Sequence, residues 1–348
     1  MKKVLIFSSQ ILILIVIYQF GSEIARFFHL KIPGNVIGIL LLLGLLWTRV
    51  IKVEHIDLAA TWLLKHLSFF FIPIAVGLMT LGPIFLHKGV IILFVLVTSA
   101  FIGLLSAGKA TQSVIMKKEK VNVNYHDHSI FLTISVYKLA RRFGQRFSSP
   151  LTSPVFLSTL IIIILLVGSH ITYHEYIPAK KIMTYLLGPA TVALAVPIYK
   201  NRNLIGKYMV AACVGLLIGT VTTITSAIVI AKCFYFSKML LLSLTIKSVT
   251  VPVATEIGKI IKGNVSLIAA FVILTGMIGA MFGPKLLSMF KIHHPFARGL
   301  SIGTIAHGIG TAEAVKEGEI QGAVAGAAMG IAALLISFII PYLIPYLL

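Results

Sequence analysis

Long apolar stretches dominate the chain, and short polar segments separate them. The stretches lack the alternation with period two that marks the strands of a membrane barrel. Their length suits a helix that crosses a hydrocarbon core about 30 Å thick. Because lipid offers no hydrogen-bond partners, backbone groups inside it must pair within the chain, as they do in a helix. The pattern therefore predicts an all-α polytopic membrane protein.

The first apolar half predicts a bundle of four membrane-spanning helices, at residues 4–20, 36–51, 67–86 and 89–107. Lys and Arg residues gather in the loops on one side of these spans, and the positive-inside rule makes that side, with the N-terminus, cytoplasmic. The start, Met1-Lys2-Lys3 before an apolar run, resembles a signal peptide. No small-x-small cleavage pattern follows, so we interpret the run as an uncleaved span.

A polar, basic segment at residues 108–128 divides the chain into two modules, 1–107 and 129–348. It contains Lys117-Lys118-Glu119-Lys120 and has no apolar face, which indicates a solvated cytoplasmic linker.

The second module begins with a short apolar run and basic residues at 129–146. This segment is either a helix lying at the cytoplasmic interface or a short tilted span. Further spans are predicted at 151–169, 182–199, 208–231, 239–260, 264–285, 298–315 and 320–347.

Composition narrows the class of protein further. Hydrophobic residues make up 58% of the chain and charged residues 11%, which is too apolar for a soluble domain. The net charge is +20, and the basic residues that produce it lie mostly between the apolar stretches and not on one clustered face. We therefore assign them to the loops and expect no nucleic-acid partner. Cys213 and Cys233 form no CxxC pattern, and neither a disulfide nor a metal site is expected.

Two of the apolar segments carry polar residues at hydrocarbon depth. Segment 239–260 contains the run Lys247 to Glu256, with a proline, three hydroxyl residues and two charges. Segment 298–315 contains four glycines and His307. Irregular backbone at this depth is tolerated only where protein or a water-filled cavity surrounds it. Both segments are therefore predicted to be broken helices shielded by the bundle.

A weak internal repeat accompanies these segments. Residues 215–220 resemble residues 299–304, an offset of 84 residues. The match would place 208–231 on 298–315 and 182–199 on 264–285. A shift of three spans reverses orientation, so the sequence suggests a possible inverted repeat, as in secondary transporters.

The first broken segment has the residues of a small-anion site. Pro252 interrupts helical hydrogen bonding, and a helix that restarts there points partial positive charge into the bundle. Lys247 adds a full charge, while Ser248, Thr250 and Thr255 add hydroxyl groups. Alternatively, Lys247 extends to the interface and the hydroxyls bond their own helix.

The second broken segment suggests a proton-coupling residue. His307, near Thr304 and Thr311, titrates close to physiological pH, or it is a polar residue bonded to a neighbouring helix. Glu256 is either a proton relay or part of an ion pair with Lys259 at a helix end. The remaining acidic residues of this region are expected at the membrane interface: Glu313, Glu317 and Glu319.

The chain contains no nucleophile elbow, phosphate-binding loop or HExxH motif. We therefore expect no enzyme activity and no cofactor.

Three passages of the second module resemble the LrgB/CidB family over 129–348. They are the run Leu187 to Pro197, the run Ser248 to Glu256, and Ala306-His307-Gly308-Ile309-Gly310-Thr311-Ala312 with the later Gly322-Ala323. The family often has Ser before the histidine, and Ala306 here puts any role of that hydroxyl in doubt.

The first module is similar to the LrgA/CidA holin-like family, on the run Ile32 to Gly38 and its four spans. The fused order is similar to that of the plastid glycolate/glycerate translocator of plants. The resemblance implies either secondary transport of small monocarboxylates, such as glycolate, glycerate or pyruvate, or holin/antiholin control of murein hydrolase export and cell lysis.

Of these two readings, the polar broken helices favour transport by alternating access in a bacterial plasma membrane. The first module would be a scaffold or an oligomerisation part, and a homo-oligomer in lipid is expected. Glu256 and His307 are candidates for proton coupling. The expected substrate-binding residues are Lys247, Ser248, Thr250, Pro252, Thr255, Thr304, His307 and Thr311.

Overall fold

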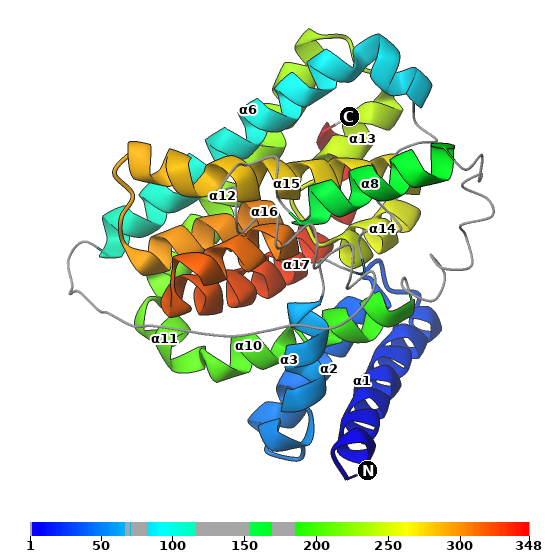
Figure 1. Ribbon diagram of the computed structural model, residues 1–348, viewed down its shortest axis with the longest axis vertical. Helices are drawn as coiled ribbons and strands as arrows, with labels where there is room; N and C mark the ends of the chain where they lie inside the picture. Colours follow the sequence, from blue (N-terminus) through cyan, green and yellow to red (C-terminus); the bar gives the residue numbers. More distant parts are fainter. Residues whose placement is uncertain (1, 67–69, 71–81, 116–153, 169–184, 348) are drawn as a thin grey trace.

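The computed structural model describes residues 2–66, 70, 82–115, 154–168 and 185–347 (Figure 1). Within these residues the regular structure is helical and contains no strand. The prediction of an all-α membrane protein is confirmed.

Five helices are long and apolar enough to cross a membrane, so the chain is a multi-pass membrane protein. They are α1 (Lys2–Phe27), α6 (Gly82–Ile115), α12 (Met209–Cys233), α15 (Val265–Met289) and α17 (Glu319–Leu347). Each coincides with an expected span.

The remaining helices are shorter. In the first module, α2 (Gly34–Trp47) begins directly after Pro33 and is followed by η1 (Val53–His55) and α3 (Asp57–Lys65). In the second module, α8 (Pro154–Gly168), the helical residues 185–192, α10 (Ala195–Lys200) and α11 (Arg202–Lys207) precede α12. The expected span 182–199 is therefore interrupted, at 193–194. Segment 129–146 lies outside the described residues.

The boundary expected between spans 67–86 and 89–107 is wrong, because α6 runs without a break through His87 and Lys88. Lys88 stays in the helix with its ammonium 5.4 Å from the centre of the Phe236 ring, so its stem packs while its charge stays at the helix end. At its other end α6 continues to Ile115, past the expected end at 107. Most of span 67–86 lies outside the described residues.

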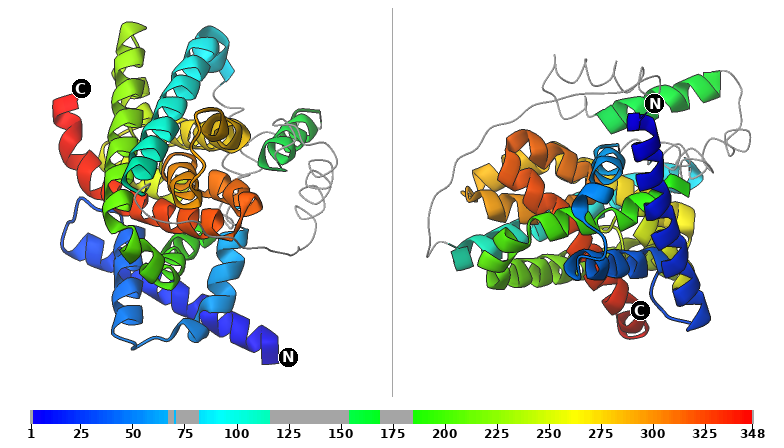
Figure 2. Two further views of the ribbon diagram at one scale, coloured as in Figure 1. Left: turned by 90° about the vertical axis from the view of Figure 1, so that its left-hand side faces the viewer. Right: turned by 90° about the horizontal axis from the view of Figure 1, so that it is seen from below.

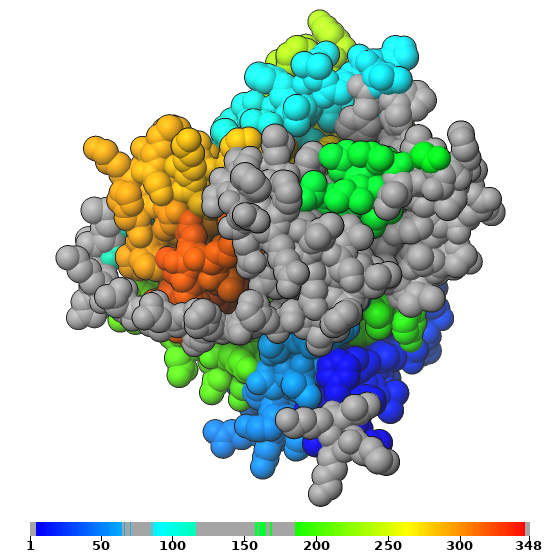
Figure 3. All heavy atoms as spheres, viewed as in Figure 1, coloured from blue at the N-terminus to red at the C-terminus, as the bar shows by residue number. Residues whose placement is uncertain are grey.

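Helix α6 packs against the second module and not against α1 to α3. Its neighbours are α12, α15 and α16, and Figures 1 and 3 show it at the opposite end of the molecule from α1 to α3. It runs beside α12 (Figure 2), where a Cβ atom on Gly219 would lie 2.6 Å from that of Ala107. Small residues of this kind let two membrane helices approach closely.

Helices α13 (Lys238–Thr245) and α14 (Val251–Ile260) form a hairpin with its tip at residues 246–250. The amide nitrogen of Asn264, just after α14, lies 3.9 Å from the sulfur of Met239, at the start of α13. A continuous helix would separate these residues by about 37 Å. The chain therefore enters the bundle, turns at the tip and returns to the same side.

Helix α16 (Pro295–Glu317) is a second hairpin, and its tip is His307, with φ 41° and ψ −136°. Arg298 near its start and Glu317 at its end form an ion pair of 2.5 Å. In a straight helix these residues would be about 28 Å apart. The prediction of broken helices is confirmed for both segments, and neither segment crosses the bundle.

The two hairpins enter from opposite ends of α6. The open end of α13–α14 lies at the start of α6, where Phe94 packs against Phe234. The open end of α16 lies at the other end of α6, where Gln112 donates to the carbonyl of Lys291 and accepts from the backbone N–H of His294.

The internal symmetry differs from the expected repeat. Helix α12 with hairpin α13–α14, and α15 with hairpin α16, are two helix-plus-hairpin units of opposite orientation, because the first hairpin returns the chain to the side where α12 ends. The match of 215–220 to 299–304 instead equates a continuous helix with a hairpin, so that correspondence is wrong. Its glycines share only a packing role: Gly215 contacts α6, and Gly303 contacts α17.

Candidate functional site

Lys247 lies at the tip of the α13–α14 hairpin and is 1% exposed. Its Nζ donates to Thr223 Oγ1 of α12 at 2.8 Å and to Ser248 Oγ at 3.3 Å. The Thr223 hydroxyl donates in turn to the carbonyl of Ser99 in α6 at 3.1 Å. In the part of the chain that the structure describes, no carboxylate pairs with Lys247. The alternative in which Lys247 extends to the interface is wrong.

His307 forms the tip of the opposite hairpin and is also 1% exposed. Its Nε2 lies 2.9 Å from the carbonyl oxygen of Val272 in α15. The ring packs against the backbone of Gly276, where a Cβ atom would lie 2.5 Å from Cε1. A Cβ atom on Gly103 of α6 would lie 2.7 Å from Cβ of Thr223, the partner of Lys247, and 2.8 Å from Cδ1 of Ile305, two residues before His307. The two hairpin tips therefore approach the same part of α6. The expected bond of His307 to a neighbouring helix is present, and its role in proton coupling stays a prediction.

Within the described part of the chain, four buried threonine hydroxyls have no hydrogen-bond partner: Thr220, Thr250, Thr275 and Thr304. Thr250 belongs to the first tip, and each of the others lies one helical turn from Thr223, Val272 or His307. Burying a hydroxyl without a partner costs about 1 to 3 kcal/mol. Their positions, at one tip or one turn from the partners of the two tips, provide hydrogen-bonding capacity that the described residues do not use.

The backbone of α14 adds positive potential. Its N-cap is Thr250, and Pro252 lies in its first turn, where its missing N–H breaks no helical bond. The N-terminal end of α14 therefore begins at the buried tip, and its N–H groups carry partial positive charge there.

The structure does not bring every expected site residue together. Thr255 donates to the carbonyl of Pro252, and Thr311 donates to that of His307, so both hydroxyls serve their own helix. Glu256 is 41% exposed and lies 2.6 Å from Lys259, which is the ion pair considered as an alternative to a proton relay.

Four contributors escaped the sequence analysis: Ser99, Thr220, Thr223 and Thr275. They lie in regular apolar helices, where a hydroxyl usually bonds a carbonyl of its own helix, as Thr225 does with Val221. The sequence around Thr223 and that around Thr225 carry no signal that separates the two cases.

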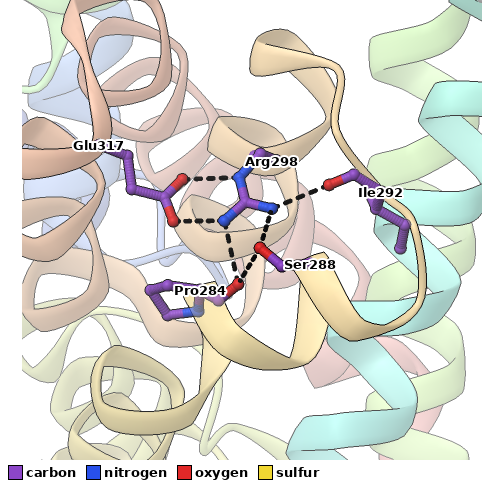
Figure 4. A network of polar contacts seen from close by, with 5 residues as sticks. All are labelled: Pro284, Ser288, Ile292, Arg298 and Glu317. Carbon is purple, nitrogen blue, oxygen red and sulfur yellow. Dashed lines mark hydrogen bonds and ion pairs between the residues drawn. The ribbon is translucent and has the colours of Figure 1, made fainter.

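A second buried charge closes the open end of the α16 hairpin (Figure 4). The Arg298 guanidinium donates to both carboxylate oxygens of Glu317, at 2.8 and 2.5 Å. It also donates to the Ser288 hydroxyl and to the carbonyls of Ile292 and Pro284, all at the end of α15 or just after it. The expectation of an interfacial Glu317 is wrong, because its side chain is 16% exposed and paired. This network anchors the hairpin whose tip is His307.

The described residues contain no group of three His, Cys, Asp or Glu side chains that could hold a metal ion. Cys213 and Cys233 are both exposed and free.

Long apolar helices around two opposed hairpins with polar tips define a polytopic α-helical membrane protein with a buried polar centre. The model of the LrgB-like family matches residues 133–346, and the chain belongs to this family. The model of the LrgA family matches residues 18–111, so one chain carries both matches in N- to C-terminal order.

Related proteins match just over half of the chain. Uncharacterized protein YwbG of Bacillus subtilis is 37% identical over 186 residues, which is 53% of this chain and 83% of the relative. Uncharacterized protein YxaC of the same species is 35% identical over 191 residues, 55% of this chain and 83% of the relative. The Holin-like protein CidB of Staphylococcus epidermidis is 31% identical over 187 residues, which is 54% of this chain and 82% of the relative. No solved structure matches.

Proposed function

We propose that the protein is a secondary transporter of small monocarboxylates, of the glycolate, glycerate or pyruvate class, and that it works by alternating access. The observation that carries the proposal is Lys247, a fully buried ammonium group that has only hydroxyl partners among the described residues.

A buried charge without a counter-ion costs several kcal/mol, and ionisable groups inside membrane bundles mark substrate or ion pathways. A small carboxylate would supply the missing negative charge. Its oxygens would accept hydrogen bonds from Lys247 and from the unpartnered threonine hydroxyls. The start of α14 would add its favourable dipole.

The opposed hairpins suit alternating access. Each tip ends at the site, and each hairpin lies between the site and one side of the bundle. Movement of one hairpin would open the site to one side while the other keeps it closed. Within this proposal the N-terminus is cytoplasmic, the membrane is a bacterial plasma membrane, and the first module is a scaffold or oligomerisation part of a homo-oligomer.

The second candidate function is a holin-like regulator of murein hydrolase export and cell lysis. The printed name of the CidB relative, a holin-like protein, favours it. A holin-like pore would pass solutes regardless of charge, and it would not depend on Lys247.

Uptake of labelled glycolate and pyruvate into proteoliposomes tests the proposal, with labelled sucrose trapped inside to report leakage. We expect Lys247→Ala to lower uptake by about 30-fold or more, because losing one partner of a buried charged pair costs about 2 to 5 kcal/mol. His307→Ala is also expected to lower uptake, because the hairpin tip loses its bond to α15.

Two exposed residues provide matched controls, Lys238→Ala and His293→Ala, and both should transport like the wild type. Undiminished uptake in both Lys247→Ala and His307→Ala would overturn the site. Sucrose leakage without carboxylate uptake would favour the holin-like function.

A further inference from the structure

Among the residues that the structure describes, Lys247 has no permanent counter-ion. Its immediate partners, Thr223 of α12 and Ser248 of its own hairpin, are uncharged. His307 of α16 forms the opposing tip, and Ile305, two residues before it, packs at Gly103 of α6 as Thr223 does. None of the other ionisable groups described on these helices bonds to Lys247: His87, Lys88, Lys109, Cys213, Lys232, Cys233, Lys238, Glu256, Lys259, Lys285, Arg298, Glu313, Lys316, Glu317, Glu319 and Tyr342.

The hydroxyl shell can serve either protonation state of Lys247. The oxygens of Thr223 and Ser248 lie 3.4 Å apart, and either can be the donor. A hydroxyl accepts from an ammonium group and donates to the lone pair of a neutral amine. The shell therefore needs only a rotation of its hydrogen atoms when the proton leaves.

Glu256 and His307, the two proton-coupling candidates from the sequence, are less suitable than Lys247 for binding and releasing a proton at the site. Glu256 is largely outside the buried centre and paired with Lys259. The Nε2 of His307 is engaged by a backbone carbonyl, and its ring is held against Gly276. Protonation of His307 at Nδ1 would keep the bond of Nε2 to Val272 but would add a second positive charge to the buried centre. Release of a proton from Lys247 removes a positive charge and needs no rearrangement of heavy atoms.

We propose that Lys247 is the proton-coupling group of the transporter: the loaded protein crosses with an ammonium–carboxylate pair, and the empty protein crosses with a neutral amine. This rests on the proposed function. On the entry side the amine takes up one proton and the ammonium binds one carboxylate anion. On the exit side both leave, so each cycle moves one proton and one anion and no net charge.

The wild-type flux tests the stoichiometry. Proteoliposomes with a trapped pH indicator should acidify by one proton for each glycolate taken up, above the rate in protein-free liposomes. A pH gradient that is alkaline inside should drive accumulation, and a potassium diffusion potential of either sign should leave the uptake rate unchanged. Uptake that moves net charge, or moves no proton, overturns the coupling but leaves carboxylate transport intact. Absence of uptake overturns the proposed function itself.

The Lys247→Arg variant keeps the positive charge but cannot release the proton, because arginine remains protonated in proteins. The loaded form can still cross, so exchange of internal for external glycolate should persist. The empty form cannot become neutral, so accumulation driven by the pH gradient should fall at least tenfold. The control is Lys238→Arg, which should show both activities.

Gradient-driven accumulation by Lys247→Arg at the wild-type level would overturn the proposal. If this variant shows neither activity, Lys247→His provides the second variant: a histidine can still release its proton, so net uptake should persist with its pH dependence shifted to lower pH. Net uptake by this variant with unchanged pH dependence would also overturn the proposal.

Discussion

Apart from Thr223 and Ser248, which bond Lys247, the buried hydroxyl groups of the described residues fall into two sets. One set bonds a carbonyl four residues earlier, as Thr111 does with Ala107 and Ser301 does with Ala297. These hydroxyls satisfy themselves within one helix and need no other role. The second set, with Thr304 as an example, has no partner and gathers around two hairpin tips. Local chemistry accounts for the first set, and ligand binding would account for the second.

Replacing Thr304 with Val distinguishes these roles. The change removes a buried hydroxyl that has no partner, so the free energy of unfolding should stay the same or rise by about 1 kcal/mol. If the hydroxyl binds substrate, the KM for glycolate should rise about five- to tenfold, the worth of one hydrogen bond of about 1 to 1.5 kcal/mol.

The matched control is Thr111→Val, which should lower stability by about 1 kcal/mol and leave the KM unchanged. Thermal unfolding and uptake kinetics on both variants measure these effects. A Thr304→Val protein that is less stable and has an unchanged KM would show that the hydroxyl is structural.

Single-residue reasoning found part of this site. Lys247 and His307 stand out because ionisable residues are rare at hydrocarbon depth. Ser248, Thr250 and Thr304 were found because they accompany them in the chain. Thr223 and Thr275 were not, because the folded contacts that distinguish them come from helices distant in sequence.

At the scale of elements, the sequence predicts the breaks but not the direction of the chain after each break. Proline and glycine identify segments that cannot remain continuous helices. Whether the chain then continues across or turns back depends on contacts such as Arg298 with Glu317, 19 residues apart. No local pattern encodes such a pairing, which is why both segments were expected as spans and are hairpins.

The contact between α15 and the tip of α16 can be tested with glycine substitutions in one helix. Gly276→Ala places a methyl group 2.5 Å from Cε1 of His307, which must displace the ring from Val272. Gly283→Ala adds the same group at 3.6 Å from Leu104, an ordinary contact. We expect uptake to fall tenfold or more in the first variant and to change less than twofold in the second, in the same proteoliposome assay. Equal activity of the two variants would contradict a fixed position for His307.

At the scale of the whole molecule, the two modules share a helix. The sequence divides the chain at a polar linker, yet α6 begins in the first module, continues into the first residues of that linker, and packs among α12, α15 and α16. The composition of α6 does not reveal this, because an apolar helix with small residues packs equally well in either module. Its close contacts, such as Gly219 with Ala107, exist only in the assembled fold.

The arrangement of the whole molecule also explains how residues 60 positions apart form one site. Hairpins α13–α14 and α16 enter from opposite ends, and their tips approach the same part of α6, because Thr223, the partner of Lys247, and Ile305 both pack at Gly103. Two helix-plus-hairpin units of reversed orientation provide one barrier on each side, and the proposed mechanism requires both.

Labelling from the two sides of the membrane tests this central claim most directly. In a protein with Cys213 and Cys233 replaced by Ser, single cysteines at Lys238, Lys259, His293 and Lys316 would be treated with a membrane-impermeant maleimide in vesicles of known orientation. The opposed hairpins predict that 238 and 259 are labelled from one side and that 293 and 316 are labelled from the other. If the two positions of either pair are labelled from opposite sides, that segment crosses the membrane, and the account of the site is contradicted.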